Sequence, residues 1–423
     1  MTTSDDDFAS ALAHWQTDQL PAAEAALQHL LAHAPEHAHG LQLLGAVFGS
    51  QGRAAEALAP LQRAAELQPD SASAHHNLGN VLAMLGRRED ALASLGRSLA
   101  LVSANPAALM TQARTLMELQ RPLEALQSVD LALSLEPQWA LAWQCRGDVL
   151  GLLSGMGMNR RDDAIEAYRR ARAHGGDADE LDFCLAAIGA APAPTAAPAQ
   201  VVSSLFDTYA PNFEQHLQAL HYRTPQHIAQ VLQQAGVGSA QSPLAEVWDL
   251  GCGTGLCAPL LRPLAQRLVG VDLSTGMLDR AHARDTYDAL QCADIVDALL
   301  GRVADIDLLV AADVFVYIGD LRAVFGAARC VLRPGGHFVF SIEALEGRLL
   351  ETAVAPALGP ALEPALEPGY RLQPTRRYAH SIGYIEGLAA VHGLKVRARE
   401  PGVLRENAGL DVDGWVLLLQ RQG

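Results

Sequence analysis

Residues 245–261, AEVWDLGCGTGLCAPLL, decide the fold of this chain. A short apolar run ends at an acid, passes through three alternating glycines and then takes a helical pattern. This order predicts a strand, a tight turn and a helix N-terminus. Gly251, Gly253 and Gly255 allow positive φ angles and carry no Cβ atoms. A ligand can therefore lie directly against the backbone of this turn.

The next apolar run, residues 267–272, ends at a second acid, Asp272. It stands 21 positions after Gly251, close to the offset of about 20 residues expected for a ribose-binding carboxylate. A dinucleotide-binding loop needs Gly or Ala at its sixth position, but this loop has Leu256 there. Asp249 would repel a diphosphate and attract an ammonium group. The two acids therefore predict an α/β domain that binds a nucleoside without a pyrophosphate.

The strings DLGCGTG at 249–255 and VGVDLS at 269–274 resemble the first two motifs of class I S-adenosylmethionine-dependent methyltransferases. The resemblance implies a Rossmann-like α/β domain with a seven-stranded, mostly parallel sheet and S-adenosyl-L-methionine as cofactor. Asp249 and Gly251 would fix the methionine end, and Asp272 would accept both ribose hydroxyls. The implied cofactor-binding residues are Tyr209, Asp249, Gly251, Cys252, Gly253, Gly255, Asp272, Leu273, Met277, Asp294, Ile295 and Asp313.

The adenine side of the site and the remaining strands follow from the same resemblance and from apolar runs. An acid after the third strand would meet the adenine amine, with Ile295 beside the ring; Asp294 is the first choice and Asp297 a competitor. A long Pro/Ala/Leu/Glu-rich insertion at 344–378 is placed where a substrate lid belongs. The predicted strands are 245–250, 267–272, 289–293, 306–312, 330–343, 394–399 and 415–420, the last antiparallel.

The first half of the chain, residues 1–188, is self-similar with a period of 34 residues. The recurring pairs are Leu44-Gly45, Leu78-Gly79, Gln112-Ala113 and Arg146-Gly147. The pattern resembles the tetratricopeptide (TPR) repeat family, with four to five repeats if a degenerate one at 8–34 is counted. The predicted architecture is therefore an all-α TPR solenoid followed by the α/β domain. Its concave face would hold a protein or peptide partner, or the repeats would serve only homo-oligomerisation.

An Ala/Pro linker at 189–200, GAAPAPTAAPAQ, separates the solenoid from residues 201–244, and the methyltransferase core follows at 245–423. Residues 201–244 contain a pattern, FDxYA…FExHL…LxYRxP, similar to the N-terminal lid of bacterial methyltransferases that carry such repeats. In that family the lid covers the cofactor. Tyr209 and Phe213 would then shield a sulfonium with their ring faces.

Methyl transfer to an N–H or O–H acceptor calls for a base that titrates near neutral pH. His216 and His380 are the first candidates and Asp313 and Tyr317 the next, although Asp313 equally suits the cofactor's ammonium. No Cys/His set with metal-ligand spacing is present, so no metal is predicted.

The overall charge bears on partners and location. The formal net charge is −16 without clustered Lys or Arg, which disfavours nucleic acid as a partner. The six cysteines form no CxxC pair, and the acidic N-terminus precedes no long apolar run. These features predict a cytoplasmic chain without a membrane span.

The combined expectation is a methyltransferase whose repeats recruit a protein or carrier-bound acceptor. One alternative is an O- or C-methyltransferase acting on a small molecule of quinone or fatty-acyl type, with repeats that oligomerise it. Another is a non-catalytic adaptor that senses the cofactor. The intact acids Asp249 and Asp272 argue against this last alternative.

Overall fold

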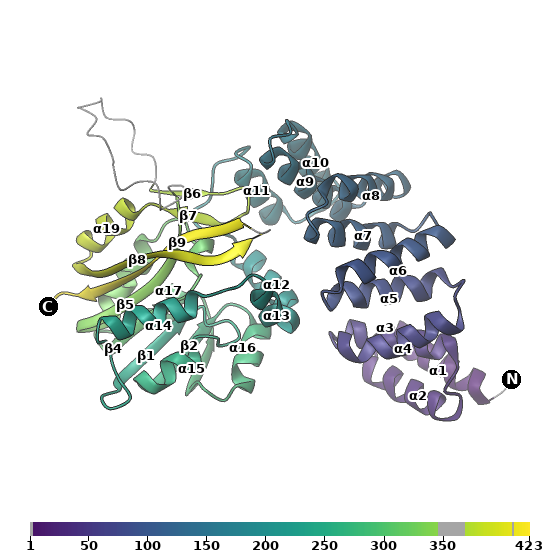
Figure 1. Cartoon of the computed structure of the whole chain (residues 1–423), viewed down its shortest axis with the longest axis horizontal. Helices are drawn as coiled ribbons and strands as arrows, with labels where there is room; N and C mark the ends of the chain where they lie inside the picture. The colour runs from purple at the N-terminus through teal and green to yellow at the C-terminus, as the bar shows by residue number, and fades with distance from the viewer. Residues whose placement is uncertain (1–2, 346–368, 408–409) are drawn as a thin grey trace. The chain divides into compact units, whose positions relative to one another are not determined.

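The computed structural model describes residues 3–345, 369–407 and 410–423. These residues form two compact units, Met1–Leu181 and Asp182–Gly423, and each is considered by itself (Figure 1). Most of the predicted insertion at 344–378 lies outside the described residues.

The first unit is helical, as the 34-residue period predicts, and its helices pair in chain order within the described residues. Small residues allow each close approach. A Cβ added to Gly45 would lie 2.3 Å from Leu61 Cγ, and one added to Gly147 would lie 2.5 Å from a Tyr168 ring carbon. The helices are α1 (Thr3–Gln16), α2 (Leu20–His33), α3 (Ala38–Ser50), α4 (Ala54–Leu67), α5 (Ala72–Met84), α6 (Arg88–Leu101), α7 (Pro106–Glu118), α8 (Pro122–Leu135), α9 (Ala140–Gly155) and α10 (Arg161–Ala173).

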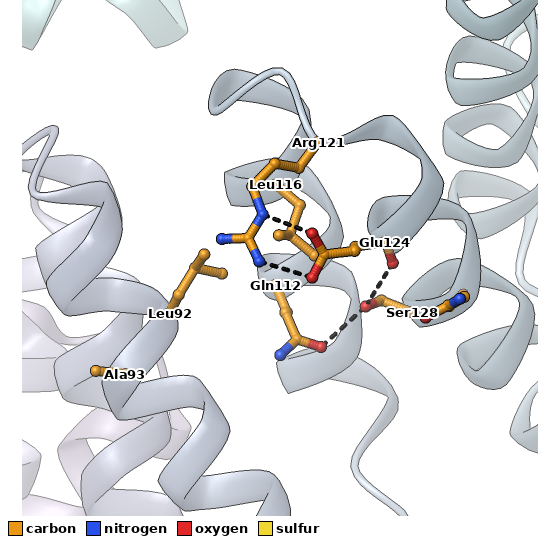
Figure 2. Close-up of a pocket in the computed structure, with 8 residues that line it drawn as sticks. Leu92, Ala93, Gln112, Leu116, Arg121, Glu124 and Ser128 are labelled. Atoms are coloured by element: carbon orange, nitrogen blue, oxygen red, sulfur yellow. Dashed lines mark hydrogen bonds and ion pairs between the residues drawn. The ribbon is translucent and has the colours of Figure 1, made fainter.

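A groove of about 450 Å³ opens between α6, α7 and α8 (Figure 2). Its polar side chains bond to one another. Arg121 forms a two-pronged ion pair with Glu124, and Ser128 donates to Gln112 Oε1 at 2.9 Å. Figure 2 shows the apolar side chain of Leu92 on the facing helix. The groove is far in sequence from the glycine loop and takes no part in the site described below.

The second unit is built on one twisted sheet, and the strand prediction is confirmed in its main features. Parallel strands run in the order β3-β2-β1-β4-β5, β9 pairs antiparallel with β5, and β8 pairs with β9. The short hairpin β6–β7, which joins the end of β5, was not predicted. The strands are β1 (Leu244–Leu250), β2 (Ala265–Asp272), β3 (Ala289–Cys292), β4 (Ile306–Ala311), β5 (Leu332–Ala344), β6 (Tyr370–Leu372), β7 (Tyr378–His380), β8 (Leu394–Asn407) and β9 (Leu410–Arg421).

Both faces of this sheet are covered, which explains its continuous apolar strands. On β1, Val247 packs into one core while Trp248 and Leu250 pack into the other. The helices of this part are α11 (Ala178–Ala187), α12 (Ala199–Tyr209), η1 (Ala210–Asn212), α13 (Phe213–Ala219), α14 (Thr224–Gln234), α15 (Ala258–Leu261), η2 (Arg262–Leu264), α16 (Thr275–Ala283), α17 (Ile295–Leu299), η3 (Phe315–Tyr317), α18 (Arg322–Val331) and α19 (Ile382–Val391).

The Ala/Pro linker is bound to the second unit rather than spanning freely. Thr195 O accepts the backbone N–H groups of Gly319 and Asp320 at 2.8 Å each, and Ala197 N donates to Tyr317 O at 2.8 Å. Ala196 forms an isolated antiparallel bridge with Ile318. The linker therefore supports the segment that follows β4, where the sheet presents its ligand-binding edge.

Candidate cofactor and acceptor site

The glycine loop after β1 has the backbone that its sequence predicts. Gly251, Gly253 and Gly255 have φ angles of +66°, +54° and +85°. A Cβ on Gly251 would lie 2.4 Å from Val314 Cγ2, so this glycine also admits the segment after β4. A Cβ on Gly253 would meet only the ring of Phe213, at 3.7 Å. The loop therefore offers bare backbone at Gly253, with a lid ring above it.

Asp272, at the end of β2, joins this loop to the next helix. Its Oδ2 accepts the Gly253 N–H at 2.8 Å, and its Oδ1 accepts the Ser274 N–H at 2.9 Å. The residue is 9% exposed, and this burial raises the pKa of its carboxyl. A carboxylate has about four lone-pair sites, so Asp272 keeps acceptor capacity beyond its backbone bonds. An acceptor of this kind fits the hydroxyls of a ribose.

Asp249, at the end of β1, has a partner that the sequence did not reveal. Tyr287 donates its hydroxyl to Asp249 Oδ2 at 2.6 Å. The Tyr287 ring fills the space beside Gly255 and Gly270, where added Cβ atoms would lie 3.0 and 3.1 Å from it. Burial raises the pKa of Asp249 to about 7. A contact between Asp249 and the cofactor's ammonium would therefore use Oδ1.

The buried Asp249 predicts a pH-dependent stability. Because its pKa rises from 3.8 unfolded to about 7 folded, the protonated carboxyl stabilises the fold at low pH. That contribution, on the order of 4 kcal/mol, is lost as pH rises from about 4 to about 7. The unfolding free energy of wild type minus that of Asp249→Asn should therefore fall across this window. Denaturant titrations at several pH values measure it, and two parallel curves would contradict the assignment.

The residues expected on the adenine side lie at the same sheet edge. Asp294 caps α17, since its Oδ1 accepts the N–H groups of Val296 at 2.8 Å and Asp297 at 3.3 Å. Its other oxygen is the one that would meet an adenine amine. Ile295 is buried and Asp297 is exposed, which favours Asp294 of the two acids. Met277 and Cys252 are buried beside the loop, and Leu273 is half-buried.

The lid helices bring Phe213 to the site, as expected, together with Phe206, which was not expected there. Phe213 packs edge-on against Phe206 (centroids 5.9 Å apart), and Phe206 packs in the same way on Tyr317 (5.4 Å). Tyr209 is 41% exposed, and its ring lies 5.7 Å from that of His216. Phe206 and Phe213 therefore stand nearer the glycine loop and β4, and the geometry favours them over Tyr209 as the shield. Phe206 opens the quoted lid motif, so the sequence contained this signal.

The edge of the sheet beyond β4 holds a network of two acids and two arginines. Arg405 Nη1 donates to Asp313 Oδ2 at 2.9 Å, and its Nη2 contacts Glu343. Arg377 donates to Glu343 Oε1 and to the Tyr317 hydroxyl, each at 3.2 Å. The Arg405 side chain is only 5% exposed, so it is a buried cation that depends on both acids.

Asp313 is held in place by Ser341 and Arg405. It has φ of +57°, and its N–H donates to Ser341 Oγ at 2.8 Å. Ser341 Oγ in turn donates to Asp313 Oδ1 at 3.1 Å, and Arg405 binds Oδ2. Each Asp313 oxygen thus has one partner, and the carboxylate keeps further acceptor capacity.

His380 does not suit the role of base that its residue type suggested. Its Nε2 lies 3.0 Å from Ile318 O and 3.1 Å from Gly319 O, and because carbonyls only accept, Nε2 carries the proton. Burial lowers the pKa of His380 to about 4. The ring thus anchors the segment after β4. Of the candidate bases, His216, Asp313 and Tyr317 stay proposals. The ring of His216 on α13 lies 5.7 Å from that of Tyr209 on α12.

Comparisons with known proteins agree with this architecture. A family model described as a methyltransferase domain matches residues 248–340, and models described as TPR repeat and tetratricopeptide repeat match residues 45–86 and 76–140. The chain therefore carries a methyltransferase domain preceded by tetratricopeptide repeats, which confirms the sequence prediction. Such a domain implies the use of S-adenosyl-L-methionine.

Curated relatives match part of the chain. Nodulation protein S of Rhizobium tropici is 33% identical over 24% of this chain and 44% of its own length. Methyltransferase-like protein 27 of Homo sapiens is 42% identical over 20% of this chain and 34% of its own length. Malonyl-[acyl-carrier protein] O-methyltransferase of Serratia marcescens is 34% identical over 25% of this chain and 41% of its own length. The chain thus spans less than half the length of these relatives. The solved structure of MamA protein matches at 21% identity and a TM-score of 0.36, over 41% of this chain and 91% of that one.

Residues 3–345, 369–407 and 410–423 contain no helix that combines the length and the apolar character needed to cross a membrane. They also contain no group of three or more His, Cys, Asp or Glu side chains placed to hold a metal ion.

Proposed function

We propose that the protein transfers a methyl group from S-adenosyl-L-methionine to an acceptor that the repeat unit recruits. The observation that carries the proposal is Asp272, which is tied to the bare glycine loop by one oxygen and to the start of α16 by the other. A carboxylate has about four lone-pair sites, so acceptor capacity remains at the sheet edge where α/β folds bind nucleosides. Few other ligands need this combination of bare backbone and a prepositioned carboxylate.

The chain's own groups perform three tasks in this proposal. Asp272 and Asp294 bind and orient the nucleoside, and Asp249 lies near the methionine end. The rings of Phe206 and Phe213 exclude water above the loop. When bound, S-adenosyl-L-methionine supplies an electrophilic methyl group on a sulfonium. Because the donor is already activated, positioning and desolvation are the main contributions that the protein must make.

The acceptor we propose is a protein or a carrier-bound group. Tetratricopeptide repeats are helical pairs that stack into surfaces for other chains, which supports recruitment by the first unit. The relative from Serratia marcescens is named for a malonyl group on an acyl-carrier protein. A small-molecule acceptor is the second candidate, since another relative is named as a ubiquinone biosynthesis O-methyltransferase of Cupriavidus pinatubonensis.

The experiment that tests this proposal uses methyl-labelled S-adenosyl-L-methionine. The full chain is incubated with the protein fraction and, separately, with the small-molecule extract of the same cells, and an Asp272→Asn chain serves as the background. Label in protein, including protein-bound thioesters, supports a macromolecular acceptor. Label in the extract alone supports the small-molecule alternative. No label above background in either fraction would contradict methyl transfer.

Two truncations separate recruitment from folding. A chain that starts at 182 keeps the linker contacts at Thr195 and Ala197, whereas one that starts at 201 loses them. We expect the first to bind cofactor with wild-type affinity but to turn over the true acceptor at least about tenfold more slowly. The second should be less stable, because Gly319 and Asp320 lose their backbone partner. Equal turnover by the full chain and the chain from 182 would contradict recruitment.

A further inference from the structure

Asp207, on lid helix α12, contacts the turn that follows the ribose-binding acid. Its Oδ1 accepts the Ser274 hydroxyl at 2.5 Å and the Gly276 N–H at 3.0 Å. Ser274 is the N-cap of α16, and its Oγ accepts the Met277 N–H at 3.0 Å. The start of α16 is therefore capped twice, once by its own serine and once by an acid 67 residues earlier in the chain.

The packing between α12 and α16 is close at this point. A Cβ added to Gly276 would lie 3.3 Å from Ala210 Cβ and 3.3 Å from Asp207 Oδ1. A side chain larger than hydrogen at Gly276 would press on this contact. The corner between α12 and η1 thus rests directly on the α16 N-terminus.

The contact continues to the cofactor site through one residue. The N–H of Ser274 donates to Asp272 Oδ1 at 2.9 Å, while its hydroxyl donates to Asp207. Asp207 therefore orients Ser274, which in turn orients Asp272. Movement of the lid helix away from α16 would release one of the two bonds that fix the Ser274 side chain and free the turn beside the carboxylate.

A second lid acid makes a parallel connection to the glycine loop. Glu214 on α13 forms an ion pair with Arg284 at 2.6 Å, and Arg284 Nε donates to the carbonyl of Thr254 at 2.7 Å. Thr254 stands between Gly253 and Gly255. The lid is thus tied to both halves of the proposed cofactor site, to α16 by Asp207 and to the loop by Glu214.

We propose that Asp207 is a positioning residue that holds the lid closed and aims Asp272, with Glu214 and Arg284 as the second tie. Cofactor exchange then requires both ties to open. The inference rests on the proposed cofactor site, but it assigns to these lid acids a role in the rate of cofactor release rather than in direct contact with the ligand.

The test measures release of S-adenosylhomocysteine from the full chain by stopped flow. We expect Asp207→Ala to speed release at least about tenfold, because one carboxylate loses two hydrogen bonds. Asp207→Asn should restore most of the slow release, since its amide oxygen can accept the same two bonds. Glu214→Ala should also speed release. As a control, Asp279→Ala removes an exposed acid from α16, the helix that Asp207 contacts, and should leave the release rate unchanged.

Hydrogen exchange in the cofactor-free chain provides a readout that needs no ligand. Amides of α12 and of the Ser274–Gly276 turn should exchange faster in Asp207→Ala than in wild type, while β1 and β2 stay protected. Unchanged exchange with unchanged release would overturn the inference, and so would faster exchange throughout β1 and β2. If wild type does not bind S-adenosylhomocysteine, the proposed function fails, and exchange alone decides whether Asp207 holds the lid.

Discussion

Replacing Asp272 with asparagine should reduce the affinity for S-adenosyl-L-methionine by roughly 100-fold or more. The carboxylate offers a charged acceptor to two ribose hydroxyls, and each charge-assisted bond contributes about 1.5–3 kcal/mol. Asparagine retains one oxygen, which can keep the bond from either Gly253 or Ser274. Its amide group presents donors at the other position, so both the loop and the ribose lose an acceptor.

Calorimetry with the folded variant measures this loss directly. Asp279→Asn provides the matched control, because it removes the same charge from an exposed position on α16. That control should bind with wild-type affinity. An Asp272→Asn chain that is folded and binds within about threefold of wild type would refute the role given to this carboxylate.

Replacing Arg405 with methionine should destabilise the second unit by about 3–5 kcal/mol. The guanidinium is 5% exposed and bonds Asp313 and Glu343, whose side chains are 15% and 10% exposed. Its removal leaves two buried carboxylates, of which Glu343 keeps its ion pair with Arg377. Urea titration of the full chain, followed by hydrogen exchange of amides in β5 and β8, measures the change in this unit.

Arg399→Met supplies the control on the same strand, β8. Arg399 pairs with Glu386 at 3.0 Å, but the two side chains are 50% and 44% exposed. An exposed pair of this kind contributes no more than about 1 kcal/mol. Equal losses in the two variants would contradict the view that the network after β4 is held together by a buried charge.

The parts of this molecule that follow from local chemistry were predictable. The alternating glycines predicted the tight turn after β1, because left-handed φ angles favour glycine. Asp272 and Asp294 could be placed because both stand at the ends of apolar runs, and parallel strands bring such ends to one edge. The 34-residue period predicted the helical pairs because close helix packing needs a small residue, such as Gly45 against Leu61, at a fixed interval.

The remaining residues have partners that are distant in sequence. Tyr287 meets Asp249 across 38 residues, Asp207 meets Ser274 across 67, and Arg405 meets Asp313 across 92. No local pattern reports such pairs, since each forms only when strands and lid are assembled. The residue type of His380 suggested a base, but its burial and its two carbonyl acceptors decide its protonation, and neither can be read from the sequence. The strands β6 and β7 have three residues each, too few for a periodicity to show.

The most direct measurement is a crystal structure of the full chain soaked with S-adenosylhomocysteine. The account predicts density across the loop at Gly251–Gly255, with both ribose hydroxyls within hydrogen-bonding distance of Asp272 and the adenine near Asp294. Phe213 should cover the bound ligand. Density for the ligand at any other place, with this loop and the Asp272 carboxylate left uncontacted, would contradict the central claim.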